Sequence, residues 1–142
     1  MSGADKFRSA MALLQAGLYN AAAQALRASV QAAETSATET TLYNDRSGYL
    51  RAHTKGSAFG LEGKLVADAP WAGFVENGTV AHDIVAHGSA LSFVVNGERR
   101  FAQRVHHPGT KARPFMDVAR NLGEQTLDYG LELMVTEAIE RA

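Results

Sequence analysis

Apolar residues in the first quarter of the chain recur every three or four positions, the spacing of one face of an α-helix. Residues 5–34 are also rich in alanine and contain no proline, so we predict a helix over this segment. A helix of that length spans about 45 Å, so it must project beyond its own core or pack against another subunit. The alternative is two shorter helices broken near Gly17. The predicted apolar stripe is Phe7, Met11, Leu14, Leu18, Ala22, Ala25, Ser29 and Ala33, widened by Leu26 and Val30.

The middle of the chain, residues 42–107, has strand and turn signals and is predicted to form a small sheet. The polar, β-branched residues 35–41 are predicted to form the loop that leads into it. Residues 45–51 read as a turn, because aspartate and serine initiate turns and glycine permits a positive φ. Weak strand patterns follow at residues 52–57 and 61–67.

A short helix is predicted near residues 70–77, between the strands. Pro70 suits the first position of a helix, and Asn77-Gly78 would end it with a residue in the left-handed conformation. The residues that would share the buried face of this helix are Trp71, Phe74 and Val75.

The clearest local signal is the dipeptide Asn96-Gly97 between two β-rich runs, residues 91–95 and 98–106. This pattern is typical of a hairpin with a type I′ turn. Residues 82–89 before it are predicted to be a short strand or loop. In the second run Phe101, Gln103 and Val105 alternate with Ala102, Arg104 and His106, as in a strand with one exposed face.

A second long helix is predicted over residues 114–141. Gly123 and Gly130 weaken it by up to about 1 kcal/mol each, and we interpret them as points of close packing. The order helix, small antiparallel sheet, helix predicts an α+β fold, and 142 residues fit one domain, 1–142. The apolar stripe of this helix is Phe115, Val118, Leu122, Tyr129 and Leu133, with Leu127, Met134 and Ile139 as further apolar positions.

Composition narrows the class of protein. Hydrophobic residues make up 46% and charged residues 20%, which is typical of a globular chain. A net charge of -1 argues against a general nucleic-acid binder, and the absence of cysteine excludes disulfides and thiolate metal sites. The sequence has no apolar run of the roughly 20 residues that a membrane span needs, and no signal-peptide pattern. We therefore expect a soluble domain made in the cytoplasm.

The histidines raise a metal hypothesis, in which His82, Asp83, His87 and His106 would serve a small metal-dependent hydrolase. Their spacing matches no zinc signature, and adjacent residues such as His106 and His107 point to opposite faces of a strand. Surface or capping histidines are the interpretation that the spacing favours. The sequence also has no nucleophile elbow, no acid/base pair and no phosphate loop, so we predict no enzymatic activity, no metal and no cofactor.

A basic cluster lies between residues 99 and 113. It could contact a phosphate backbone, as in a nucleic-acid-binding factor, or it could be the solvated face of a hairpin that guards an edge strand. No aromatic stacking pattern accompanies it, so single-strand binding is not indicated. Its members are Arg99, Arg100, Arg104, His106, Lys111 and Arg113.

Residues 105–116 form a joint between the hairpin and the last helix. Pro108, Gly109 and Pro114 make this segment an irregular connector whose φ is fixed at two points. Such a connector either pins the chain to its core or presents a surface to a partner.

Three segments together resemble the tail-completion, or head–tail joining, protein family of tailed phages. Residues 46–51 resemble its R-(S/T)-G-x-L-R segment. Residues 69–79 resemble its Y-A-x-(Y/F)-V-E-x-G-T segment, from which Trp71 and Gly73 depart. Residues 107–116 resemble its H-P-G-(T)-x-A-x-P-F-(L/M) joint before the last helix. The motif residues are Arg46, Gly48, Leu50, Trp71, Phe74, Val75, Glu76, Gly78, Thr79, His107, Pro108, Gly109, Ala112, Pro114 and Phe115.

The resemblance implies a structural protein of the virion, assembled in the host cytoplasm and without catalytic activity. Members of the family form a ring, commonly of six copies, between the portal and adaptor proteins of the head and the tail terminator or tail tube. Double-stranded genomic DNA passes through the ring without sequence-specific binding. A tail terminator ring is the alternative within this class.

The resemblance also implies roles for the motif residues. Arg46, Gly48 and Leu50 would set the turn into the sheet, and Glu76 would cap a helix or pair locally. Pro108, Gly109, Pro114 and Phe115 would fix the joint. The loop of residues 80–90 is the preferred contact with an adjoining ring or the lumen. The residues predicted to contact a partner or the lumen are His82, Asp83, His87, Arg99, Arg100, Arg104, Lys111 and Arg113.

Overall fold

The computed structural model describes residues 2–141, and its longest element is the N-terminal helix α1 (Gly3–Glu39). A capping box starts this helix: the Asp5 amide donates to Ser2 Oγ over 3.2 Å, and the Ser2 amide donates to Asp5 Oδ2 over 3.0 Å. The bonds from Ser2 hold the pKa of Asp5 below its usual value, because they favour the charged carboxylate. The helix runs without interruption through Gly17, so the alternative of two shorter helices is wrong.

The loop predicted over residues 35–41 is also wrong for most of its length, since α1 continues to Glu39. Thr38 Oγ1 donates to the Glu34 carbonyl over 2.8 Å, which satisfies its hydroxyl inside the helix. Ala37 is fully buried, so tertiary packing holds this last turn in spite of its β-branched residues.

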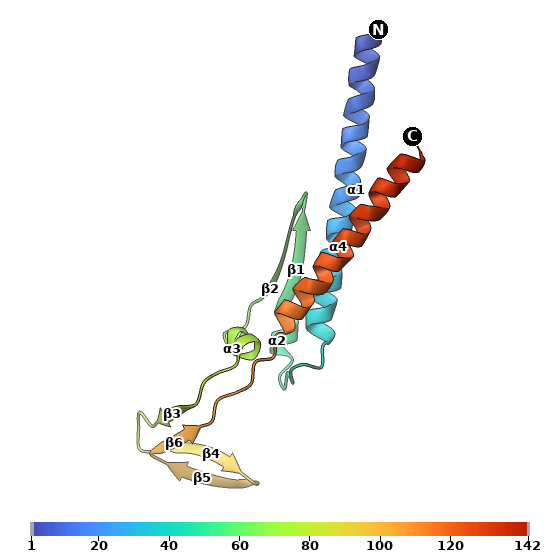
Figure 1. Cartoon of the computed structure of the whole chain (residues 1–142). Helices are drawn as coiled ribbons and strands as arrows, with labels where there is room; N and C mark the ends of the chain where they lie inside the picture. The colour runs from blue at the N-terminus through green and yellow to red at the C-terminus, as the bar shows by residue number, and fades with distance from the viewer. Residues whose placement is uncertain (1, 142) are drawn as a thin grey trace.

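The C-terminal helix α4 (Phe115–Glu140) packs antiparallel to the second half of α1 (Figure 1). The contact is close because its residues are small. A Cβ added at Gly123 would lie 3.2 Å from Ala33 Cβ, and one at Gly130 would lie 3.0 Å from Ala25 Cβ. Ser29 Oγ donates to the Gly123 carbonyl over 2.7 Å. The prediction that both glycines are points of close packing is confirmed.

A short helix α2 (Tyr49–Ala52) leads into a hairpin formed by β1 (Thr54–Phe59) and β2 (Glu62–Ala67). The strands pair antiparallel from Thr54↔Ala67 to Phe59↔Glu62. They lie along α1, where Gly56 and Gly63 face Val30; a Cβ at either glycine would come within 2.7 Å of that side chain. The predicted strands at residues 52–57 and 61–67 are therefore present, with the first displaced by two residues.

The core lies where the end of α1 meets α2 and the start of α4. Leu50 and Phe115 are each 1% exposed. The Tyr43 ring contacts the Phe115 ring edge-on at 4.8 Å between centroids, and its hydroxyl donates to the Ala37 carbonyl over 3.0 Å. Burial raises the pKa of Tyr43, which keeps the phenol a neutral donor. Alanines complete this core: Ala33, Ala37, Ala69, Ala72 and Ala119.

The remaining strands form an arm, residues 82–107, which stands away from the two-helix body (Figure 1). In it β3 (His82–Val85) pairs with β6 (Arg104–His107), and β4 (Leu91–Val95) pairs with β5 (Glu98–Ala102). Asn96 and Gly97 have φ values of 51° and 81°, which confirms the type I′ hairpin turn.

The single strand predicted over residues 98–106 is divided at Gln103, because its two halves pair with different partners. Residues 82–85 form a strand whose four residues are all exposed. The observed architecture is α+β, as predicted.

The apolar stripes predicted along the two long helices are largely exposed. In α3 (Ala72–Asn77) the buried residue is Ala72, and Val75 is partly buried against the core. Trp71 and Phe74 are 40% and 62% exposed, so the predicted burial is wrong for these two residues. In α4 the buried residues are Phe115, Ala119 and Gly123. The residues of the predicted stripes that remain exposed are Phe7, Met11, Leu14, Leu18, Val118, Leu122, Tyr129 and Leu133.

The chain exposes an unusually large surface for its mass. Its solvent-accessible surface amounts to 10486 Å². A compact monomer of 15.2 kDa is expected to expose about 7,100 Å². The chain therefore exposes about half as much surface again as its mass predicts, and many of its large apolar side chains are exposed. Within residues 2–141 no helix is long and apolar enough to cross a membrane.

Candidate functional site

The second and third sequence motifs meet at a crossing of two backbone segments, Gly78-Thr79 and Gly109-Thr110, which we call the clasp. Thr79 and Thr110 exchange backbone hydrogen bonds, each amide donating to the other's carbonyl over 3.0 Å. Their hydroxyls lie 3.1 Å apart, and the Thr110 amide also donates to Thr79 Oγ1 over 3.0 Å. The clasp joins the two chain segments that enter and leave the arm.

Glycine is required on both sides of the clasp. Gly78 has a φ of 71° and Gly109 a φ of 85°, both in the left-handed region. A Cβ at Gly78 would lie 2.5 Å from the Thr110 carbonyl oxygen, and one at Gly109 would overlap the carbonyl oxygen of Thr79. The two Gly-Thr pairs of the motifs are therefore explained by one close backbone contact.

Glu76 connects the clasp to the last helix. Its Oε2 accepts from the Met116 amide over 2.9 Å, and its Oε1 accepts from the Asp117 amide over 3.0 Å. These are free amides of the first turn of α4, so the carboxylate caps that helix and complements its dipole. The Arg113 amide also donates to the Val75 carbonyl over 2.8 Å. The predicted cap is present, but it acts on a helix forty residues away.

We predict that Glu76→Gln lowers the free energy of unfolding by about 1–2 kcal/mol, because a neutral amide replaces a charged cap on two amides. Denaturant unfolding followed by circular dichroism measures this change. Glu62→Gln is the matched control, since Glu62 is exposed and its side chain makes no hydrogen bond or ion pair in the described chain. Equal losses in the two variants would contradict the capping role.

The first motif lies in the same core as Ala72 and Phe115. Gly48 has a φ of 73° before α2, and Leu50 lies in the core. The residue that organises this segment is Arg51, whose guanidinium donates to the carbonyls of Thr38 and Thr40. These are carbonyls at the C-terminus of α1, where a cation is favoured.

Arg46 takes no part in a hydrogen bond or ion pair within residues 2–141, so the predicted role in the turn belongs to Arg51 and Asp45 instead. Asp45 Oδ2 accepts from the Arg51 amide over 2.8 Å. The guanidinium of Arg51 also lies 4.7 Å from the Tyr43 ring centroid. Arg51 ends the segment 46–51 that resembles the family, but the predicted motif residues did not include it, and nothing in the pattern pointed to Tyr43.

The joint before α4 has one buried residue. Phe115 anchors it in the core, and Pro114 precedes the helix as its N-cap residue. Pro108 and Ala112 are exposed. The joint therefore fixes the direction in which the chain enters α4.

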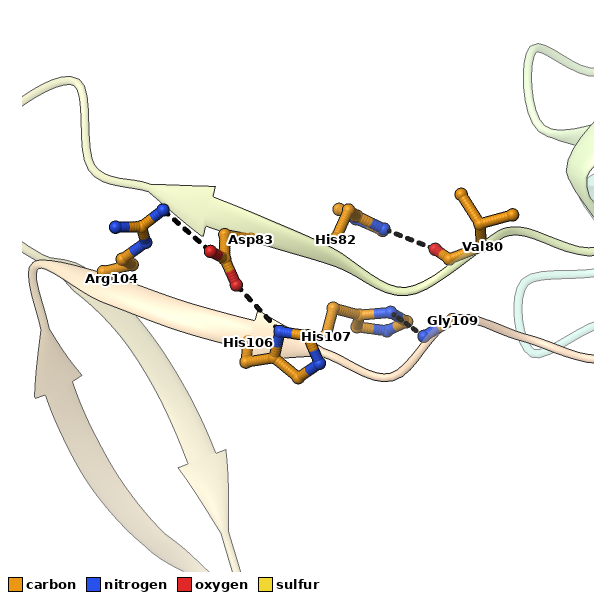
Figure 2. A network of polar contacts seen from close by, with 7 residues as sticks. All are labelled: Val80, His82, Asp83, Arg104, His106, His107 and Gly109. Carbon is orange, nitrogen blue, oxygen red and sulfur yellow. Dashed lines mark hydrogen bonds and ion pairs between the residues drawn. The ribbon is translucent and has the colours of Figure 1, made fainter.

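A polar network lies on one face of the β3–β6 pair (Figure 2). Asp83 Oδ2 accepts from Arg104 Nη2 over 2.8 Å, and Asp83 Oδ1 lies 2.8 Å from His106 Nδ1. The Arg104 and His106 side chains are each 68% exposed, so this network adds little stability.

His82 and His107 lie opposite each other on the other face of the pair, with ring centroids 5.1 Å apart. His107 Nδ1 accepts from the Gly109 amide over 3.1 Å, which in the neutral ring leaves the proton on Nε2. His82 Nδ1 lies 2.9 Å from the Val80 carbonyl. Both rings are thus tied to the chain segments that lead to the clasp (Figure 2).

The candidate metal ligands His82, Asp83, His87 and His106 do not converge. His82 and Asp83 point to opposite faces of β3, and Asp83 is engaged by Arg104. Among residues 2–141 no group of three or more His, Asp or Glu side chains is placed to hold a metal ion.

The basic cluster is spread along the arm and its base. Arg100 and Arg104 pair with Glu98 and Asp83, whereas Arg99 donates to Ser92 Oγ over 2.9 Å. Lys111 and Arg113 have no acidic partner within residues 2–141 and line a hollow beside the clasp. Its apolar lining includes Trp71, Phe74 and Val80.

A second hollow lies between the diverging ends of α1 and α4. Its lining is mostly apolar and includes Leu14, Gly17, Leu18, Gly130, Leu133 and Met134. Beyond it the first turns of α1 extend past the end of α4 (Figure 1). The surfaces available for interaction are thus this helical end, the hollow at the clasp and the arm.

No protein-family model, curated protein or solved structure matches this chain.

Proposed function

We propose that this chain is a structural protein of the phage neck, which forms a ring between the head portal and adaptor proteins and the tail and surrounds the DNA channel. The observation that carries the proposal is the large apolar surface that a single copy leaves exposed. A chain with this surface needs partners, and a ring of identical copies supplies them on two sides of each subunit.

The motif geometry supports the same proposal. The residues that resemble the head–tail joining family hold together the core, the clasp and the start of α4, and so set the direction of the arm. An arm held away from the body can reach a neighbouring ring, and the exposed strands of residues 82–107 offer free edges for pairing.

A joining assay tests this function. Heads and tails assembled without this protein are expected to remain separate and to form complete particles when purified protein is added. Particles that join equally well without it would contradict the proposal.

The exposed end of α1 provides a specific prediction. The double variant Leu14→Glu with Leu18→Glu is expected to lose self-association, because the two side chains are 53% and 39% exposed and line the hollow between the helices. Sedimentation velocity measures the change. Leu61→Glu is the control, since Leu61 is 56% exposed at the turn of the β1–β2 hairpin. A double variant that associates like the control would show that this end of the helix is not an interface.

A further inference from the structure

The outer side of α4 has a stripe of acidic residues. Asp117, Glu124, Asp128 and Glu132 are exposed, and their spacing of four and seven residues places them along one side of the helix. Within residues 2–141 only Asp117 of these four has an ion-pair partner, which is Arg120. The stripe therefore carries negative charge that the chain itself does not neutralise.

An apolar stripe runs beside the acidic one. Val118, Leu122, Tyr129 and Leu133 are spaced by four, seven and four residues, which places them along a second line of the helix, and they are 45%, 42%, 64% and 45% exposed. Of these, Leu122 and Leu133 also line hollows on the side of α4 that faces α1. A surface with an apolar stripe next to an acidic stripe fits a partner that presents apolar side chains beside a cation.

The β4–β5 hairpin at the end of the arm presents such a face. The register pairs Ser92 with Phe101 and Val94 with Arg99, so these four residues share one side of the hairpin. Val94 and Phe101 are 64% and 66% exposed. Arg99 donates to Ser92 and has no carboxylate partner within the described chain.

The hairpin cannot reach the outer side of α4 in its own chain. The arm and the C-terminal half of α4 extend toward opposite ends of the molecule (Figure 1). A contact between them must therefore join two copies, and because it uses different surfaces on each copy it continues head to tail into a ring or an open chain. The excess accessible surface is sufficient for it, since a standard interface buries about 800 Å² on each partner.

We propose that the β4–β5 hairpin of one copy docks across the exposed surface of α4 of the next copy, with Val94 and Phe101 against the apolar stripe and Arg99 against the acidic stripe. This inference rests on the proposed function, because the contact would join neighbouring subunits of the proposed ring. The contact also makes the association sensitive to salt, because one of its components is electrostatic.

Disulfide trapping tests the contact, and the chain is suited to it because it contains no cysteine. Phe101→Cys and Gln125→Cys are introduced into separate full-length chains, which are mixed and oxidised. Gln125 is exposed between Leu122 and Asp128 on the outer side of α4. A disulfide-linked heterodimer is expected. The control mixture replaces Phe101→Cys by Lys55→Cys, on the exposed side of β1, and is expected to give at least tenfold less product.

Charge reversal tests the role of Arg99. Arg99→Glu on the Phe101→Cys chain, or Asp128→Arg on the Gln125→Cys chain, is expected to lower the trapping yield at least tenfold. Combining both reversals is expected to restore the yield, which a merely structural effect would not do. Lys55→Glu on the Phe101→Cys chain is the charge control and is expected to leave the yield unchanged.

Three results would overturn the proposed contact. The first is a heterodimer yield no higher than that of the Lys55→Cys control. The second is a yield that does not change on charge reversal. The third is a protein that shifts the mobility of duplex DNA, with Arg99→Glu abolishing this shift while leaving the yield of disulfide-linked heterodimer unchanged. That result would identify the hairpin as a nucleic-acid-binding surface. If the protein joins heads to tails but no disulfide-linked heterodimer forms, the proposed contact is refuted and the neck function is not. If the heterodimer forms but heads and tails do not join, the neck function is refuted and the contact is not.

Discussion

Gly109→Ala is expected to destabilise the protein by about 3 kcal/mol, measured by denaturant unfolding. Two penalties add at this position. An alanine at a φ of 85° is strained by roughly 1–2 kcal/mol, and its Cβ would overlap the Thr79 carbonyl oxygen. The chain would have to open the clasp to relieve the overlap, so we also expect loss of the fixed connection between arm and body.

Substitutions at two other glycines distinguish the backbone strain from the steric overlap. Gly48 has a φ of 73° but open space around it, so Gly48→Ala is expected to show the backbone strain alone, about 1 kcal/mol. Gly88 has open space and no positive φ, so Gly88→Ala is expected to change stability by less than about 0.5 kcal/mol. If Gly109→Ala costs no more than Gly48→Ala, the Cβ at position 109 does not overlap the Thr79 carbonyl oxygen, and the close backbone contact of the clasp is contradicted.

Phe115→Ala is expected to cost about 3–5 kcal/mol, which is a large part of the stability of a small domain. Phe115 is 1% exposed and contacts Tyr43 in a core otherwise built largely of alanine. Such a core has few large side chains that could move into the cavity.

Phe59→Ala is the control for this variant, because Phe59 is 91% exposed. It removes the same side chain and is expected to cost less than about 0.5 kcal/mol. The free energy of unfolding from urea titrations compares the two. A loss below about 1 kcal/mol in Phe115→Ala would mean that the core does not depend on this residue.

The long helices and the hairpin could be predicted from the sequence, because their signals are local. Alanine-rich periodicity indicates a helix whatever lies around it, and Asn96-Gly97 specifies its turn by backbone conformation alone. The same periodicity did not identify the buried face of α4. In α4 the buried positions are Ala119 and Gly123, whose small side chains carry little hydrophobic signal, whereas the larger Leu122 and Tyr129 are exposed.

The motif residues could be identified from the sequence, but most of their contacts could not. Glu76 caps a helix that begins 39 residues later, and the Gly-Thr pairs of the clasp are 31 residues apart. Contacts over such distances depend on the tertiary arrangement, which no local pattern encodes. Gln103 is a similar case, because the change of strand partner there is decided by the pairing of the whole arm.

The central claim is that the chain forms a ring at the phage neck, and electron microscopy of joined particles tests it most directly. Particles completed with purified protein carrying a label at the exposed residue Lys55 would be imaged in negative stain and averaged about the neck. We predict a closed ring of label between head and tail, in line with the DNA channel. Joined particles with no label at the neck, or label confined to another part of the virion, would contradict the account.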